Sequence, residues 1–405
     1  MKIPTIYIAI LVVLVIISGV LGYLAGFSTR APSAPVTYTL SVPFTVYSTV
    51  YATQTPTAIT SPTPTREELL KPIIEEAKKE GKLVIYSTFD RPSAEPLLKA
   101  FQSKYPFITV EYVELGTVSL YNRYLQEKAA GAPTADILWS TGVDLQYTLI
   151  LQGSAQPYRL TIYDKIPAEA KYKDLAYVPY YGLIAPIYNT QKIPKELAPK
   201  SYDDVLRLLT ERKDLFSKGS VVVFDIERST FGLVFTYYLY KANSSLTEKL
   251  FRAAGAIGVT LQAATGPQIE LVGKGEALIA TGLLSNYAYT QSKTNPNIGV
   301  FVPRDIAVLQ PAVVFITKEA RHPNAAKLLL EFIMSEEGQL ILASSNMVTS
   351  VISNPYVPEY SLDYLKKNVQ NLVVVRLGDG IIDELLKEDV RKSFISTWKS
   401  WLGLG

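Results

Sequence analysis

The hydrophobic pattern separates the first 64 residues from the rest of the chain. Residues 3–29 carry no charged side chain, and residues 8–26 are almost wholly apolar. At a rise of about 1.5 Å per residue, a helix of that length crosses a bilayer. We therefore expect residues 1–30 to be a single transmembrane helix that anchors the chain, with a cleaved signal segment as the alternative. Residues 31–64 are uncharged and dense in Ser, Thr and Pro, which is typical of a disordered, O-glycosylated stalk or of a plain linker.

From Thr65 onward, the apolar positions alternate between the helix period and the strand period. Thr65 and Glu68 form a capping-box pattern for a helix that ends at Gly81, and Pro72 is expected to bend or interrupt it. Strands are predicted at residues 83–87, 108–112 and 136–139, separated by helices that open at Pro92, contain residues 120–125 and span residues 144–152. This alternation predicts right-handed βαβ units on a mainly parallel sheet.

The second half of the chain shows the same alternation with more aromatic residues. A helix is predicted at residues 201–209, a buried strand at 221–225, and a turn at 226–232 that leads into an aromatic helix. Residues 272–276 are expected to begin a helix of small residues. Further elements are strands at residues 298–302 and 312–316, a helix at 322–335, and C-terminal helices that reach Trp401.

The stretch Ala176–Asn189 lies between these two α/β patterns. It is apolar and aromatic, carries no charge, and contains Pro179 and Pro186. We interpret it as a strand that crosses between two lobes, with Tyr180 and Tyr181 facing the cleft that the lobes enclose. The alternative is a buried strand whose tyrosines only pack against the core.

A chain of 405 residues exceeds one ordinary hydrophobic core, so a division into lobes is also expected from length. The expected division is a first lobe at residues 65–178, a second lobe at 179–300, a return to the first lobe at 301–350, and a C-terminal helical segment at 351–405 that packs on the lobes.

Composition weighs against several classes of function. A formal charge of +3 without a basic block gives no field for binding nucleic acid. The chain has no cysteine, and its only histidine is His322, which precedes Pro323 at an expected helix entry. Thiolate zinc sites and thiol nucleophiles are therefore absent, and a Ser-His-Asp triad is not indicated. We expect no catalytic residues and no cofactor.

In sheets of this kind, ligands bind beyond the carboxyl ends of the strands, near helix N-termini. Two loops after predicted strands, at residues 87–90 and 140–142, offer hydroxyl groups and backbone donors, and a turn after residues 221–225 adds a guanidinium that can hold an anion. The alternative is that the Ser and Thr residues only cap helices and that Arg228 pairs with a surface carboxylate. The candidate ligand-binding residues from these loops are Thr88, Asp90, Ser140, Thr141, Arg228, Ser229 and Thr230.

As a set, the motifs of the chain resemble a known family over roughly residues 82–343. They are at residues 86–90, 96–106, 119–123, 135–141, 188–190, 275–277, 322–327 and 336–339. They resemble the substrate-binding component of ABC importers, in the type II periplasmic-binding-protein class and its ferric-iron-transport branch. The resemblance implies two α/β lobes with a hinge, a solute trapped by lobe closure, and an ABC permease with its ATPase as partners.

The resemblance leaves the solute open. Iron-binding members carry adjacent tyrosines after an Asn, whereas this chain reads Asn286-Tyr287-Ala288-Tyr289. Many members also carry an Arg-x-Arg pair where this chain has Gly182 and Ile184. The resemblance therefore implies either Fe(III) as transported ligand, held by Tyr287 and Tyr289, or a small anion such as an organophosphate or phosphonate, with Asn286 and Tyr287 at the site. Tyr180, Tyr181 or Tyr289 could replace the missing tyrosine.

The same reasoning predicts a location at the cell surface, with the anchor in the cytoplasmic membrane and the folded body outside. Asn243-Ser244-Ser245 is an N-glycosylation sequon, which fits an exterior location. Together with the stalk and the lack of a lipid-anchor cysteine, it suggests an archaeal glycoprotein. A surface enzyme and a structural cell-surface protein are the alternatives.

Overall fold

The computed structural model describes residues 65–405, so the predicted anchor at 1–30 and the predicted stalk at 31–64 lie outside the described residues. The described residues 65–405 belong to one compact unit. Within residues 65–405, no helix has both the length and the hydropathy that a membrane crossing requires.

The first α/β run forms largely where the sequence pattern predicts it. Thr65 and Glu68 make both hydrogen bonds of a capping box, and Gly81 ends the helix in the left-handed conformation at φ 64°. The helix continues through Pro72 without interruption, unlike the expectation. The elements of this run are α2 (Arg66–Glu80), β1 (Lys82–Ser87), α3 (Arg91–Lys104), β2 (Thr109–Glu114), α4 (Thr117–Ala129), β3 (Ile137–Ser140) and α5 (Val143–Leu151).

The second run contains one clear correction. Residues 272–276 do not begin a helix but end one, because Gly275 adopts the left-handed conformation at φ 75° that closes α9. The elements of this run are β4 (Lys171–Tyr172), β5 (Ala176–Asn189), α6 (Tyr202–Glu211), β6 (Val221–Phe224), α7 (Thr230–Ala242), α8 (Ser244–Ile257), β7 (Val259–Gln262), α9 (Thr265–Lys274), β8 (Ile279–Leu284), α10 (Ser285–Ser292) and β9 (Ile298–Val300).

The remaining elements return to the middle of the molecule and then cover it. The C-terminal segment is not purely helical, because it contributes a strand that pairs in parallel with β10. These elements are β10 (Ile306–Ile316), α11 (Pro323–Ile333), α12 (Glu336–Ser344), β11 (Val348–Thr349), α13 (Leu362–Asn368), β12 (Asn371–Val374), α14 (Gly380–Leu385) and α15 (Glu388–Leu402).

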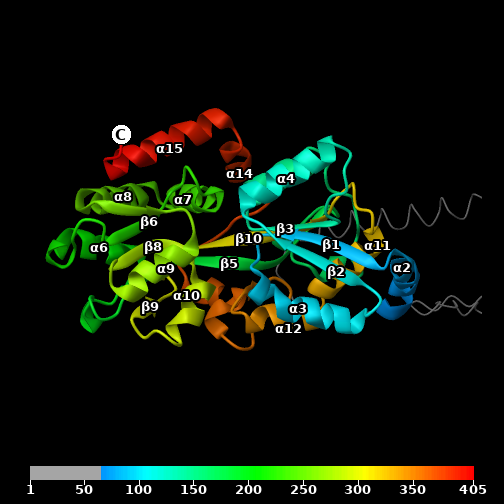
Figure 1. Cartoon of the computed structure of the whole chain (residues 1–405). Helices are drawn as coiled ribbons and strands as arrows, with labels where there is room; N and C mark the ends of the chain where they lie inside the picture. The colour runs from blue at the N-terminus through cyan, green and yellow to red at the C-terminus, as the bar shows by residue number, and fades with distance from the viewer. Residues whose placement is uncertain (1–64) are drawn as a thin grey trace, which may run out of the picture. The chain divides into compact units, whose positions relative to one another are not determined.

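A single mixed sheet connects the two runs, in the order β2-β1-β3-β10-β5-β8-β6-β7. The outer strands are parallel within each end, as the βαβ pattern predicts. The central pairs β3–β10, β10–β5 and β5–β8 are antiparallel, so the sheet is less uniformly parallel than expected. We call β2, β1 and β3 with their helices the first half, and β8, β6 and β7 with theirs the second half; β5 and β10 run side by side between them (Figure 1).

Strand β5 is paired along both edges. Ile187 pairs with Ala280 of β8 on one edge and with Val300 of β9 on the other. β9 and β10 therefore share one edge of β5, opposite β8. The other edge is covered in turn by β4, β11 and β8. The pairing with β8 shifts its register around Pro186, which has no N–H to donate. The predicted crossing strand therefore corresponds to β5, whose length lets it belong to both halves.

The C-terminal helix α15 lies along α8 and α7 of the second half (Figure 1). The approach is close, because a Cβ placed on Gly255 of α8 would lie 2.6 Å from the Cα of Leu402. Arg391 of α15 reaches in the other direction and donates to Asp144 of α5, with 3.1 Å between Nη1 and Oδ2. Burial raises the pKa of the Asp144 carboxyl, and the Arg391 guanidinium opposes this effect. The position of the lobe boundaries stays a prediction.

Replacing Arg391 with Ala should destabilise the fold by about 3 kcal/mol near neutral pH, because it leaves the buried Asp144 carboxylate without its charge partner. The pKa of Asp144 is already higher in the folded protein than in the unfolded chain, and removing the guanidinium raises it further. The loss should therefore be largest near pH 8 and shrink as the pH falls toward about 5. Urea unfolding across that pH range measures it.

The double variant Arg391→Ala with Asp144→Asn is the matched control. It should recover most of the lost stability at the higher pH, since no buried charge remains. An Arg391→Ala variant that loses stability equally at all pH values would contradict the assignment.

Candidate functional site

A cavity of about 590 Å³ lies between the carboxyl ends of the parallel strands of the two halves. Loops that follow β1, β2 and β3 form one wall, and loops that follow β6, β7 and β8 form the other. Its lining residues are Thr88, Asp90, Glu114, Leu115, Gly116, Thr117, Val118, Ser119, Thr141, Phe224, Arg228, Ser229, Phe231, Ala263, Ala264, Thr265, Gly266, Ile269, Leu284, Tyr287 and Gln291. We call it the interlobe cavity.

Two helices, one from each wall, begin at this cavity. The N-cap positions of α4 and α9 are Gly116 and Ala264, and neither makes a side-chain capping hydrogen bond. The first N–H groups of an α-helix have no partner within the helix. Residues 117–119 of α4 and residues 265–266 of α9 line the cavity, so their amides are available to a ligand there. Both helix dipoles favour negative charge at this position.

The loops of the first half are held together by hydroxyl groups. The Thr88 hydroxyl accepts from the Thr141 N–H at 2.9 Å, and the two Oγ1 atoms lie 3.3 Å apart. Asp90 caps α3 by accepting from the Ser93 N–H at 2.9 Å. These contacts fix the loops after β1 and β3 against one another and set the shape of the first wall.

Two hydrogen bonds cross from one half to the other at the cavity. The Tyr287 hydroxyl of α10 donates to Asp90 Oδ2 at 2.5 Å, and the Thr230 hydroxyl of α7 lies 3.4 Å from that of Thr117. Burial, the neighbouring Tyr180 phenol and the Asp90 carboxylate raise the pKa of Tyr287 far above its ordinary value. Tyr287 is therefore a neutral donor, and the pair bridges the halves.

Arg228 is the one cationic side chain among the lining residues, and it lies exposed at the second wall. Its backbone N–H bonds to Asp225, at 3.2 Å from the carbonyl oxygen. Within residues 65–405, its guanidinium makes no ion pair at 4.0 Å or less. Ser229 caps α7 by accepting from the Gly232 N–H, so the turn that carries Arg228 is held in place by the helix that follows.

Six of the predicted site residues thus line the interlobe cavity: Thr88, Asp90, Thr141, Arg228, Ser229 and Tyr287. Thr230 adjoins it through its contact with Thr117. Ser140 is buried, and its hydroxyl accepts from the Gly142 N–H as a local cap. Asn286 is also buried behind the wall, and its Oδ1 has no partner within the described residues.

Tyr180 and Tyr181 do not face the cavity, contrary to the expectation. Tyr180 is 3% exposed and packs against Phe89 and Trp139. Tyr181 is fully buried on the other side of β5, and its hydroxyl donates to the Glu169 carbonyl at 2.9 Å. Pairing on both edges of β5 leaves its side chains only the two sheet faces, and both faces there are covered by core. The structure matches the alternative, in which both tyrosines only pack against the core.

The predicted metal pair is also not assembled. Tyr287 and Tyr289 lie two residues apart on α10, which turns them about 200° apart around the helix. Tyr287 lines the interlobe cavity, whereas Tyr289 packs against Tyr360 and lines a different cavity. Among residues 65–405, no group of three or more His, Cys, Asp or Glu side chains could hold a metal ion.

Two loops of the site were not predicted from the sequence. Residues 114–119 follow a strand that was predicted, so the rule about carboxyl ends could have found them. Residues 263–266 follow β7, a strand that was not predicted because Val259–Gln262 is short and only half-buried. The sequence could not predict that Phe224, Phe231 and Leu284 line the cavity, because most apolar residues pack in a core.

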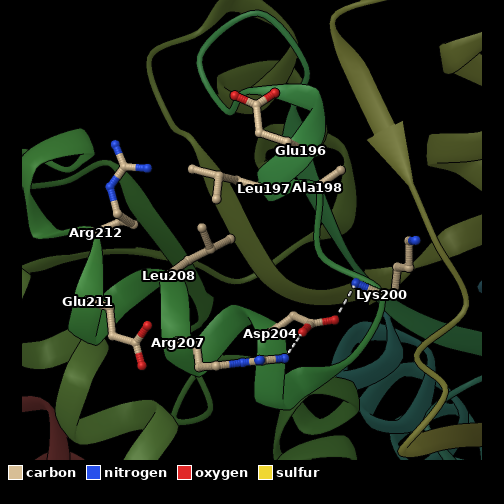
Figure 2. A pocket seen from close by; sticks show the side chains of 9 residues that line it. All are labelled: Glu196, Leu197, Ala198, Lys200, Asp204, Arg207, Leu208, Glu211 and Arg212. Atoms are coloured by element: carbon tan, nitrogen blue, oxygen red, sulfur yellow. Dashed lines mark hydrogen bonds and ion pairs between the residues drawn. The ribbon is translucent and has the colours of Figure 1, made fainter.

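A separate surface depression of about 330 Å³ lies on the second half (Figure 2). Asp204 accepts from the Lys200 backbone N–H at 2.9 Å and pairs with Arg207. Asp204 also belongs to the first turn of α6, which Ser201 caps. These interactions stabilise the start of α6, so Asp204 and Arg207 have a structural role there.

Comparison with known proteins agrees with this architecture. The family model for bacterial extracellular solute-binding proteins matches residues 97–370, more than half of the chain. The chain belongs to this family. The resemblance inferred from the motifs is therefore confirmed, and solute-binding proteins of ABC importers work outside the cytoplasm with a permease and an ATPase.

Solved structures of similar solute-binding proteins cover nearly the same part of the chain. A substrate-binding protein of an ABC transporter from Agrobacterium tumefaciens is 27% identical, with a TM-score of 0.72 over 79% of this chain and 94% of that one. AfuA from Actinobacillus pleuropneumoniae, solved with fructose-6-phosphate, is 22% identical, with a TM-score of 0.63 over 80% and 100%. Iron-bound HitA from Pseudomonas aeruginosa is 18% identical, with a TM-score of 0.61 over 79% and 99%.

One curated relative gives no information about the ligand. An uncharacterized protein from Haemophilus influenzae is 24% identical over 289 residues, which are 69% of this chain and 80% of that protein. The fold of this solute-binding protein is thus shared by proteins solved with iron and with a sugar phosphate, and the fold alone does not choose between them.

Replacing Tyr287 with Phe should loosen the two halves of this solute-binding protein, because it removes the hydrogen bond to Asp90 and keeps the ring. A hydrogen bond to a charged acceptor contributes about 1.5–3 kcal/mol. We expect a larger radius of gyration by small-angle X-ray scattering and an unfolding midpoint at lower urea.

Tyr289→Phe is the matched control, since Tyr289 lies on the same helix and its hydroxyl makes no hydrogen bond within the described residues. It should leave both measurements unchanged. Scattering curves that coincide for Tyr287→Phe and the unmodified protein would count against the bridge.

Proposed function

We propose that this protein captures a small organic anion, an organophosphate or a phosphonate, between its two halves and delivers it to an ABC permease. The observation that carries the proposal is the meeting of uncapped helix N-termini from both halves at one cavity. The amides of residues 117–119 belong to the first half, and those of residues 265–266 belong to the second. An anion that bonds to both favours the closed arrangement, since it gains its contacts only when the halves meet.

Arg228 supplies the charge that the amides lack. A guanidinium can donate two parallel hydrogen bonds to a phosphate or a phosphonate, and Arg228 stands free at the second wall. The Asp90 carboxylate already accepts from the Tyr287 hydroxyl and the Ser93 N–H. The Glu114 carboxylate accepts from the Arg91 backbone N–H. These hydrogen bonds from neutral groups hold both carboxylates in place, and the helix N-termini and Arg228 are the groups that can bond to an anion.

The apolar part of the lining indicates an organic anion and not a bare ion. Phe224, Phe231 and Leu284 line the second wall, and Leu115 and Val118 line the first. A volume of about 590 Å³ suits a small organic molecule, within the usual range of about 300–1,000 Å³ for ligand sites. The anionic group would bind at the helix ends while the organic part contacts these side chains.

Fe(III) is the less favoured ligand. The second tyrosine of the iron-binding pattern is replaced by Ala288, and Tyr289 lies outside the interlobe cavity. The Tyr287 hydroxyl is committed to Asp90, so an iron ion would have to displace that hydrogen bond. AfuA, a protein of similar fold, was solved with a phosphate ester, which supports an anion without deciding the matter for this chain.

The setting of this receptor is also a proposal. Residues 1–30 would anchor it in the cytoplasmic membrane, and residues 31–64 would hold the folded body outside the cell beside its permease. Asn243 of the sequon is exposed, as a glycosylation site requires, although its side chain also caps α8. These assignments rest on sequence composition, as does the archaeal origin.

Organophosphates and phosphonates should raise the melting temperature of this protein, by about 5 °C near a hundredfold excess over Kd. Arg228→Gln should weaken binding of the best ligand about tenfold, because it removes one charge-assisted contact. Arg207→Gln serves as the control, since Arg207 pairs with Asp204 outside the cavity, and it should bind normally. Equal affinity in the Arg228 and Arg207 variants would argue against the anion site.

Adding Fe(III)-citrate should produce no phenolate-to-iron charge-transfer band in the visible spectrum. The expectation follows from Tyr287, whose hydroxyl is committed to Asp90 and which is the one tyrosine among the lining residues of the interlobe cavity. A band that appears on titration and disappears in Tyr287→Phe would overturn the anion proposal in favour of iron.

A further inference from the structure

A second cavity, of about 660 Å³, lies beside the connection between β9 and β10. Residues 300–302 and Arg304 of this connection form one side of it. The short 3-10 helix η5 (Pro358–Tyr360) and α13 form the other side, and Lys200 and Tyr289 complete the rim. No residue lines both this cavity and the interlobe cavity. We call it the connection cavity.

The lining of the connection cavity comes from separate parts of the chain. Tyr289 lies on α10 of the second half, Val300 ends β9, and Tyr360 and Tyr364 belong to the C-terminal segment. β9 and β10 lie along the same edge of β5, and residues 301–305 are the interruption between them. An occupant of the cavity would therefore contact α10, the C-terminal segment and the connection, at the place where the strands along this edge of β5 are interrupted.

The charge of the connection cavity is unbalanced. Lys200, Arg304 and Lys367 surround it, against the single carboxylate of Glu359. Within residues 65–405, none of these four side chains takes part in an ion pair at 4.0 Å or less. The local charge is thus 3 − 1 = +2, from groups that other charges in the described structure do not neutralise.

The position of these cations is set by the backbone. The Arg304 N–H donates to the Lys200 carbonyl at 3.0 Å, and the Arg304 carbonyl accepts from the Gln370 N–H at 2.8 Å. Two of the three cations are therefore held next to each other, and the connection is tied to the segment that follows α13. Lys367 lies at the end of that helix, across the cavity.

Aromatic rings form the apolar part of the lining. Phe301 is fixed against Tyr188, with 6.3 Å between ring centroids, and Tyr289 is fixed against Tyr360 at 5.5 Å. Tyr364 of α13 adds a third accessible ring. Rings held in this way offer a surface for a planar ligand at low entropic cost.

We propose that the connection cavity is a second ligand site, which binds a small aromatic carboxylate. The carboxylate is neutralised by the cations and the ring lies against Phe301 and Tyr364. The proposal does not depend on which solute is transported.

Fluorine NMR of the full chain with 4-(trifluoromethyl)benzoate tests the proposal. The probe signal should broaden and shift on binding, with saturation below about 1 mM. Arg304→Gln and Lys367→Gln, made separately, should each weaken binding about fivefold, since each removes one charged contact. Both side chains are exposed, so their melting temperatures should match that of the unmodified protein.

Arg228→Gln shows where the probe is. It changes only the interlobe cavity, so binding of the probe should stay within twofold of the unmodified protein. Weakening by Arg228→Gln alone would place the probe in the interlobe cavity and overturn the proposal. Failure to saturate by 10 mM, or equal affinity in all three variants, would overturn it as well.

Discussion

The double pairing of β5 is the constraint on which the rest of the structure depends. A strand with both edges occupied can satisfy its ladder groups, which allows thirteen of its fourteen residues to be buried, with Tyr188 partly exposed. Buried pairing also fixes register, because a slip of one residue would exchange the two faces. Both halves extend outward from this strand. The carboxyl ends of their parallel strands face one another because β3 runs in the same direction as β5 and β8 runs in the opposite direction.

The interlobe cavity follows from that arrangement. Each parallel strand that ends there is followed by a helix, so helix N-termini collect around the space between the halves. Tyr287 and Asp90 close one side of it with a neutral donor and a charged acceptor. The open amides of α4 and α9 remain beside Arg228, which gives a polar region next to a mostly apolar wall. The site is thus a property of the topology, refined by a few side chains.

Much of the fold could be predicted from sequence, because its signals are local. The capping box at Thr65, the glycine ends of helices and the period of apolar positions act over a few residues. The pairing of β4, β9, β11 and β12 could not be predicted, since each is two to four residues long and depends on tertiary contacts. Tyr180 illustrates the limit for the site: a tyrosine in an apolar strand fits a cleft wall and a core equally well.

The contact between Gly255 and Leu402 has a consequence for how the protein is made. The surface of α8 around Gly255 is covered by residues 388–402, which leave the ribosome about 150 residues after it. Until then, apolar side chains that α15 later covers remain accessible to other nascent chains. If the chain crosses a membrane before it folds, this apolar surface is never exposed to the cytoplasm. The second half then becomes resistant to aggregation only when α15 has docked on α8.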